Sequence, residues 1–158
     1  MPEAIDTLYI LKALGFTILF VGLIGFERQK KNKIAGLTTH ILVALGAAGV
    51  TIMQEQLYYD SIQLALDFPE LAGSIMFERQ RIVAQVVTGV GFLGTGAIIK
   101  TNGYISGLTT ASTLWIGAII GIIFGYGETT LGIIVSLLAL ATLTIIKNVF
   151  WHLLEDNH

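Results

Sequence analysis

The chain of 158 residues has no cysteine, only two prolines and few charged residues. The absence of cysteine excludes disulfides, zinc–thiolate sites and thiol catalysis. Charged residues make up 13% of the sequence against 54% hydrophobic residues, and the mean hydropathy is +0.76. A water-soluble domain of this composition would have too little polar surface. The sequence therefore predicts a membrane protein that has the lipid bilayer as its surroundings.

Long uncharged runs supply the membrane-spanning segments. A hydrocarbon core of roughly 30 Å needs about 20 apolar residues in a helix. Five runs approach that length, and we expect spans at residues 7–26, 36–53, 82–99, 107–125 and 130–147. The first run follows an acidic start and is closed by a basic cluster, which favours a retained span over a cleaved signal peptide. We predict an all-α fold, with residues 1–158 as one transmembrane domain of five helices.

Charges between the spans predict an orientation. Residues 25–36 hold the densest charge of the chain, in the sequence GFERQKKNKIAG. The positive-inside rule places this basic hairpin in the cytosol, the N-terminus outside and the C-terminus inside. Residues 54–80 then form an extracytoplasmic loop. Within it we expect a short helix that lies on the membrane surface and stops near Pro69.

The sequence also contains an internal repeat. When residue n is compared with residue n+71, the GLTT of residues 36–39 matches the GLTT of residues 107–110, and Gly25 matches Gly96. Each half consists of a span, a loop, GLTT and a second span. The predicted topology makes the halves parallel repeats about an axis along the membrane normal. The fifth span lies outside the repeat.

Glycines in the fourth span predict close helix packing. Gly117, Gly121 and Gly125 recur every four residues and leave one helix face without side chains. A neighbouring backbone can approach such a face closely, which matters because lipid provides no hydrophobic drive for helix association. We favour packing within the chain over a dimer seam.

The third span contains a literal GxGxxG at Gly89, Gly91 and Gly94, followed by Gly96. A dinucleotide site would need a strand before this motif and an acidic residue about 20 positions after it, and the sequence has neither. We therefore expect packing glycines and no nucleotide. The alternative is an unwound backbone near residues 91–96, which is tolerated at membrane depth only beside protein or a water-filled cavity.

Three blocks of the sequence carry a resemblance to a known family. They are GLIGFERQKKNKIAGLTTHILVALGAAG at residues 22–49, RIVAQVVTGVGFLGTGAII at residues 81–99 and GLTTASTLWIGAIIG at residues 107–121. In order and spacing they resemble the signature blocks of the MgtC/SapB family. The resemblance implies a protein of the bacterial inner membrane that is linked to growth in low magnesium and to virulence. For the best-known members it implies inhibition of the proton-driven ATP synthase.

Two features depart from the family pattern. Thr38 and Ser106 occupy positions where similar proteins commonly have arginine, so a role for those cations does not carry over. Only residues 151–158 follow the last span. The resemblance is therefore to the transmembrane domain, without the soluble C-terminal domain of some members.

Ionisable residues at the ends of spans are the first candidates for a functional site. Glu27 and Arg28 match the GxER block of the family and lie at the end of the first span. Charges at membrane depth are costly and often functional, and the alternative is an ion pair that fixes the depth of the helix. His40 lies just inside the second span. It is either a proton relay or a hydrogen-bonded packing histidine.

Further candidates are polar residues near the ends of the other spans. Four threonines open the second and fourth spans: Thr38, Thr39, Thr109 and Thr110. They are expected to cap these helices, or to present hydroxyls around a shared cavity. Arg81 and Gln85 share a helix face in the third span, and Glu78 is spaced to pair with Arg81. We favour a polar anchor between helices for Arg81 and Gln85 over a pore or ligand role.

The residue types restrict the chemistry further. Oxygen ligands and one nearby histidine suit Mg²⁺ better than zinc or copper, and Glu27 is the best single candidate ligand. No resident cofactor is expected, and no catalytic constellation or nucleic-acid partner is indicated.

The favoured function is a regulator that binds another membrane complex, such as ATP synthase, through the glycine face or the fifth span. A homo-oligomer is also open. The alternative is a transporter or channel for Mg²⁺, another cation or protons.

Overall fold

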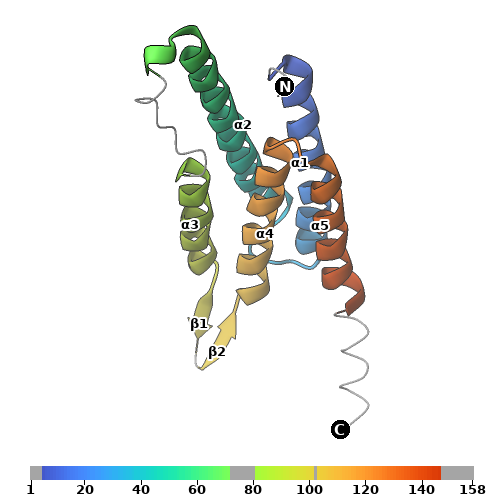
Figure 1. Ribbon diagram of the computed structural model, residues 1–158. Coiled ribbons are helices and arrows are strands. Elements are labelled where there is room, and N and C mark those ends of the chain that lie inside the picture. The colour runs from blue at the N-terminus through green and yellow to red at the C-terminus, as the bar shows by residue number, and fades with distance from the viewer. Residues whose placement is uncertain (1–4, 72–80, 102, 147–158) are drawn as a thin grey trace.

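The structure is a computed structural model that describes residues 5–71, 81–101 and 103–146 (Figure 1). The α-helices are α1 (Thr7–Lys30), α2 (Leu37–Asp67), α3 (Arg81–Gly96), α4 (Leu108–Gly125) and α5 (Thr129–Ala141). The remaining elements are the 3₁₀ turn η1 (Pro69–Leu71), the strands β1 (Ile99–Thr101) and β2 (Tyr104–Ser106), and the π-helical turn η2 (Thr142–Ile146).

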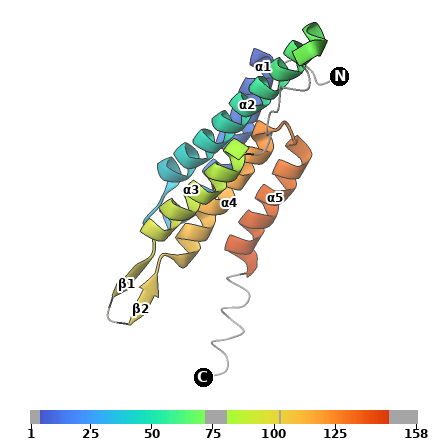
Figure 2. The ribbon, with the colours of Figure 1, turned by 60° about the vertical axis from the view of Figure 1, so that its left-hand side comes forward.

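The five α-helices run along roughly one direction, so the bundle has two ends (Figure 2). The α1–α2 turn and the β1–β2 hairpin lie at one end, which we call the hairpin end, and the start of α1 lies at the other (Figure 1). Helices α1, α2 and α4 are long and apolar enough to cross a membrane, and Thr129–Ile145 forms a shorter apolar helix. The prediction of an all-α, membrane-type bundle is confirmed.

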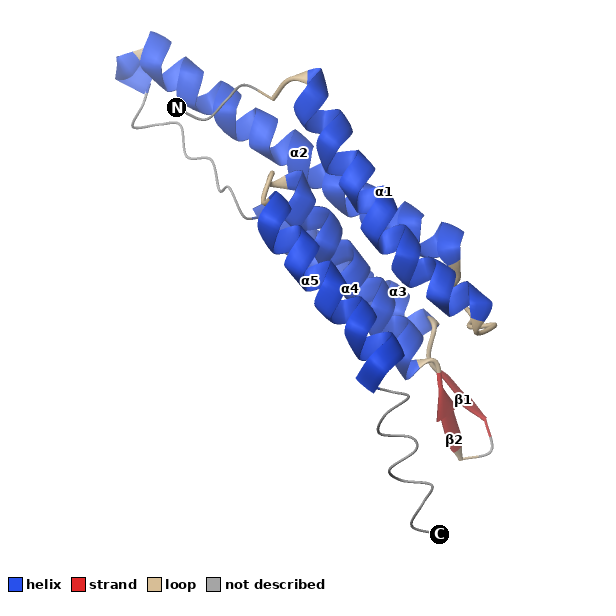
Figure 3. Cartoon of the chain, turned by 90° about the vertical axis from the view of Figure 1, so that its right-hand side faces the viewer, coloured by secondary structure: helices blue, strands red, loops and turns tan. Residues whose placement is uncertain are grey.

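Helix α4 lies at the centre of the bundle and packs against each of the other α-helices (Figure 3). Five almost completely buried apolar side chains meet where α1, α2 and α4 touch: Val21, Ile24, Ala44, Ile120 and Phe124. The rings of Phe16 and Phe20 stack on Phe124, with centroids 5.6 and 5.8 Å away. This core fills the space between the three long helices.

Glycines on α4 allow the close approach of its neighbours. A Cβ at Gly121 would overlap the carbonyl oxygen of Ala44 in α2, and a Cβ at Gly125 would lie 2.8 Å from Cβ of Thr51. A Cβ at Gly117 would lie 3.2 Å from a side chain of α1. Carbon atoms normally keep about 3.5–4.0 Å apart. The glycine face therefore packs within the chain, against α2 and α1.

Helix α2 is longer than the sequence analysis predicts. Instead of a span that ends at residue 53 and a separate surface helix, one continuous helix of 31 residues runs to Asp67. Its end extends well beyond α4 (Figure 1). The sequence from residue 50 to residue 68 contains no glycine or proline that would break a helix. A hydrogen bond of 2.8 Å from Gln56 to Asp60, one helical turn later, also supports the extension.

The predicted third span is divided between a helix and a hairpin. Helix α3 ends at Gly96 and remains α-helical through residues 91–96, so the backbone is not unwound there. Strand β1 then pairs with β2 in antiparallel register, with Ile99 opposite Ser106. The hairpin is followed by Gly107, whose φ of +89° is in the left-handed region and whose Cβ would overlap the carbonyl oxygen of Ala97. Only glycine fits this junction without strain.

The glycines of α3 mostly face away from the rest of the described chain. A Cβ at Gly94 would be in ordinary contact with Ala111 of α4, at 3.5 Å. At Gly89, Gly91 and Gly96 a Cβ would have no neighbour within 4 Å. Among the described residues these three glycines therefore contact no other helix, because α3 lies at the edge of the bundle, and their role in packing stays a prediction. The GxGxxG lies wholly inside α3 and forms no phosphate-binding loop.

The internal repeat stays a prediction. The matched residues Gly36 and Gly107 are both N-cap residues, of α2 and α4 respectively. The connections before them differ, because a short turn precedes Gly36 whereas the β1–β2 hairpin precedes Gly107.

Candidate functional site

Polar side chains of three helices meet near the hairpin end of the core. Glu27 and Arg28 lie near the end of α1, His40 lies near the start of α2, and Thr113 lies in α4. We call these four residues the polar cluster. Gly25 makes their meeting possible, since a Cβ there would lie only 2.8 Å from Cα of the first residue of α2. Helix α2 therefore starts directly against α1.

His40 is the hydrogen-bonded centre of the polar cluster and is only 1% exposed. Its Nδ1 lies 2.7 Å from the carbonyl oxygen of Gly36. A carbonyl can only accept, so Nδ1 carries a proton and donates it. Its Nε2 lies 2.9 Å from Oγ1 of Thr113, which in turn lies 2.9 Å from the carbonyl oxygen of Thr110. His40 thus joins α2 to α4.

The hydroxyl of Thr113 has one proton and two acceptors within reach. When the His40 ring is neutral, Thr113 donates to Nε2. When the ring is doubly protonated, Nε2–H donates to Oγ1, and the Thr113 proton turns to the carbonyl oxygen of Thr110. A proton at His40 would therefore change the hydrogen bonding of α4.

Arg28 is buried, with 1% of its surface exposed. Its guanidinium Nη1 lies 3.5 Å from Oε2 of Glu27, and its Nε has no hydrogen-bond acceptor among the described residues. Oε1 of Glu27 lies 2.5 Å from Nζ of Lys31. One carboxylate therefore balances two cations. This sharing leaves a net positive charge at the hairpin end of the core.

The surroundings of the Glu27 carboxylate disfavour metal binding there. Both carboxylate oxygens already face cations, so a metal ion would have to displace Lys31 or Arg28. In the described part of the chain, no group of three His, Cys, Asp or Glu side chains is placed to hold a metal ion. Mg²⁺ usually needs carboxylates and near-octahedral oxygen ligands. The polar cluster is accordingly better suited to hydrogen bonding than to holding a dehydrated cation.

The threonines at the helix starts do not cap them. The N-cap residues of α2 and α4 are glycines without a side-chain cap, and Oε1 of Gln29 accepts from the N–H of Leu37 instead. The cap prediction is therefore wrong. Three of the four threonines are exposed: Thr38, Thr39 and Thr109. Thr110 alone is buried, and its carbonyl oxygen reaches the polar cluster.

The predicted anchor in α3 is placed differently from expectation. Arg81 and Gln85 occupy the first two turns of α3, and both are exposed. Glu78 lies outside the described residues. The buried polar anchor between helices is Gln54 of α2, with 0% exposure. Its Nε2 donates to the hydroxyl of Tyr126 at 3.1 Å.

Gln54 also holds the start of α3. Its Oε1 accepts from the backbone N–H of Val83 at 3.1 Å. The first N–H groups of a helix have no partner inside that helix, so Gln54 acts as a cap supplied by another helix. The sequence does contain a signal that Gln54 is buried. His40, Ala44, Thr51 and Gln54 follow helical spacing and lie on one buried face, once α2 is known to continue past residue 53.

Sequence reasoning also missed Thr113, Tyr9 and the buried hydroxyls of the core. The hydroxyl of Tyr9 donates to the carbonyl oxygen of Gly125 at 2.7 Å and ties α1 to α4. Thr17 and Thr51 are 0% exposed, and each donates to a carbonyl of its own helix one turn earlier, at 2.8 Å. These hydroxyls are satisfied without water.

Known proteins resemble this chain over most of its length. A family model described as the MgtC family matches residues 14–150. YhiD of Escherichia coli (strain K12), named as a candidate magnesium transporter, is 39% identical over 137 residues, which are 87% of this chain and 60% of YhiD. Protein MgtC of Brucella abortus (strain 2308) is 38% identical over 133 residues, which are 84% of this chain and 47% of that protein.

A third relative is protein SapB of Bacillus subtilis (strain 168), which is 41% identical over 119 residues, 75% of this chain and 48% of SapB. The chain thus spans from about half to three-fifths of the length of these relatives. No solved structure matches it.

Proposed function

The chain belongs to the MgtC family, and on that premise we propose that it is a bacterial inner-membrane protein of magnesium homeostasis that binds and regulates another membrane complex, such as ATP synthase. The link to magnesium is supported by the family and by the name of YhiD. The regulatory role, as opposed to transport, is supported by the close packing of α1, α2 and α4.

The observation that carries the proposal is the closed core of α1, α2 and α4. Val21, Ala44 and Ile120 in its middle are 0% exposed. The glycine face of α4 brings α2 into direct backbone contact. A permeation path needs a row of polar groups or water between the two ends of the membrane. Among the described residues, the buried apolar side chains of this core lie between the polar cluster and Gln54, and the buried hydroxyls of Thr17 and Thr51 donate to carbonyls of their own helices.

A regulator acts through its outer surface. The glycine face of α4 is used inside the chain, so it does not serve a partner. The outward residues of α5 remain as the partner surface, among them Leu131, Ile134, Leu137 and Leu138, which are 49–63% exposed. These residues belong to the fifth span, outside the predicted repeat.

The second candidate function is a transporter or channel for Mg²⁺, another cation or protons. The polar cluster favours it, because His40 can exchange hydrogen bonds with Thr113 when its ring gains a proton. Such a protein would have to open the core between α2 and α4, where Gly121 contacts Ala44.

The proposal includes the orientation of the bundle in the membrane. Lys30, Lys31, Lys33 and Lys100 all lie at the hairpin end of the bundle, which supports a cytosolic location for that end and an external N-terminus. Since the chain has no cysteine, Asn32→Cys and Asp67→Cys can be labelled singly in intact cells. An impermeant reagent should reach residue 67 only. Equal labelling of both residues would overturn the orientation.

Two measurements separate regulation from conduction. The purified protein in liposomes should pass no more Mg²⁺ or protons than empty liposomes. In inverted membrane vesicles, the same protein should lower ATP-driven proton pumping. A flux that Glu27→Ala abolishes and the exposed control Glu128→Ala preserves would establish the transporter and remove the regulator. Unchanged proton pumping would remove ATP synthase as the partner.

A further inference from the structure

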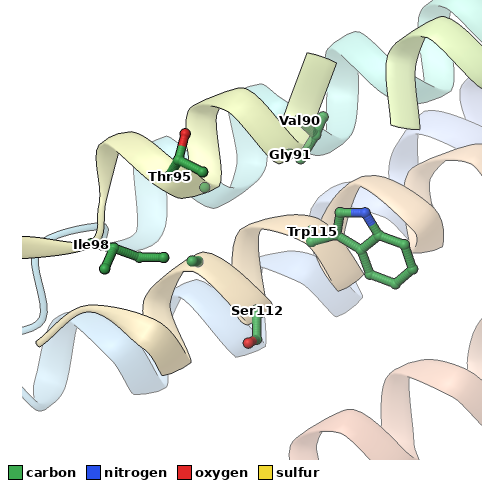
Figure 4. Close-up of a pocket in the computed structure, with 8 residues that line it drawn as sticks. Val90, Gly91, Thr95, Ile98, Ser112 and Trp115 are labelled. Carbon is green, nitrogen blue, oxygen red and sulfur yellow. The ribbon is translucent and has the colours of Figure 1, made fainter. Parts of the chain in front are cut away.

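A groove lies between α3 and α4, in the half of these helices nearest the hairpin end (Figure 4). Its volume is about 300 Å³. Gly91, Gly94 and Thr95 of α3 form one wall, and Ser112 and Trp115 of α4 form the other. The groove exists because the two glycines have no side chains to fill it.

One polar group on the groove wall has no partner in the described chain. The hydroxyls of Thr95 and Ser112 already donate to carbonyls of their own helices, at 2.7 and 2.9 Å. Trp115 is 43% exposed, and its indole N–H has no acceptor among the described residues. The indole nitrogen lies on the edge of the ring that faces Gly91 (Figure 4). A donor in hydrocarbon without an acceptor is costly, so an occupant of the groove should supply one.

Helix α3 also carries the most exposed large apolar side chain of the described helices. Phe92 is 80% exposed. It follows Gly91 directly, so it projects from α3 about 100° further round the helix axis than residue 91. Gly89 and Gly96 share the side of α3 that carries Phe92 and have open space around them. A second helix can approach this side closely.

We propose that two copies of the chain pair through α3, with Phe92 of each copy seated in the α3–α4 groove of the other. Both copies have the same orientation in the membrane, so the two-fold axis of the pair runs along the membrane normal. Such an axis keeps every residue at its own depth. Phe92 lies between Gly91 and Thr95 in the chain and is therefore at the depth of the groove in the partner.

The groove suits an aromatic ring. An engineered apolar cavity of about 150 Å³ holds a benzene molecule, so the groove has room for the side chain of Phe92. The face of a phenyl ring accepts N–H groups weakly, and Trp115 offers one. Because each copy presents both the projecting ring and the groove, the contact is made twice in a symmetric pair. A second copy is therefore the occupant that the surface fits.

Subunit counting in bilayers tests the pairing. The protein is labelled at Asn32→Cys, reconstituted at decreasing protein-to-lipid ratios and counted by single-molecule photobleaching. Phe92→Ala removes the projecting ring, and Gly91→Leu fills the groove. Neither should disturb folding, because Phe92 is exposed and Gly91 has open space. Gly46→Leu is the matched control, since Gly46 also faces open space, on α2.

We expect dimers of the parent protein, with the dissociation constant raised roughly tenfold or more by Phe92→Ala and by Gly91→Leu. Gly46→Leu should leave it unchanged. The proposal is overturned if the parent is monomeric at all ratios, which would leave the groove to lipid chains. It is also overturned if both α3 variants dimerise like the parent, or if Gly46→Leu dissociates the pair. Circular dichroism of each variant verifies that the helices are intact.

Discussion

Replacing Gly121 by alanine tests the central packing contact of the bundle. The contact between α2 and α4 is the most extensive in the structure, and at Gly121 the two backbones touch. A Cβ on residue 121 would overlap the carbonyl oxygen of Ala44 and lie 3.1 Å from its carbonyl carbon. Both of these atoms belong to the backbone, so no side chain can rotate away to make room.

The magnitude follows from the required displacement. Carbon atoms normally stay about 3.5–4.0 Å apart, so α2 would have to retreat by roughly half an ångström or more along a tightly packed interface. Overpacking of this kind costs about 1–3 kcal/mol. We expect the upper part of that range for Gly121→Ala, because the backbone of α2 has to move as a unit.

The matched control is Gly46→Ala. Gly46 is a helical glycine of α2 with open space around it, so an added methyl group meets no described residue. Alanine is favoured over glycine in helices by about 1 kcal/mol, and the control should be neutral or stabilising. The assay is equilibrium unfolding in mixed detergent micelles, followed by circular dichroism. If Gly121→Ala is as stable as Gly46→Ala, the close α2–α4 contact does not exist.

Three further substitutions remove hydrogen bonds between helices, and the same unfolding assay measures each. Gln54→Leu leaves the N–H of Val83 and the hydroxyl of Tyr126 without this partner and should cost about 1–3 kcal/mol. Tyr9→Phe loses one hydrogen bond, to the carbonyl oxygen at the end of α4, and should cost about 0.5–1.5 kcal/mol. His40→Phe removes the link from α2 to α4 and should cost about 1–3 kcal/mol. A variant as stable as the parent would show that its bond does not hold the helices together.

The sequence predicts the class of fold well, because uncharged runs of membrane length are visible without any tertiary information. The fourth span is a good example, since the sequence predicts it at residues 107–125 and α4 is Leu108–Gly125. Glu27, Arg28 and His40 were candidates from their types and positions, and the structure brings them close together. Their meeting with Thr113 required the packing of α4 against α2.

Which face of α3 points inward was not predictable, because lipid and protein core are equally apolar. The glycines of α4 pack inside whereas Gly89 and Gly96 of α3 face outward, although both sets look alike in the sequence. The hairpin could have been found, since residues 102 and 103 are Asn-Gly, a strong signal for a tight β-turn. Its short strands were hidden inside an apolar run.

The closed core of α1, α2 and α4 can be tested by the accessibility of introduced cysteines to water-soluble reagents. The chain has no native cysteine, so Thr17→Cys and Thr51→Cys introduce single thiols of similar size at two core residues that are 0% exposed. Asn32→Cys, in the exposed α1–α2 turn, is the reactive control. Permeabilised cells are treated with a small, water-soluble thiol reagent. Our account predicts labelling at residue 32 and none at residues 17 and 51, whereas rapid labelling at either core residue would show a water-filled path and contradict it.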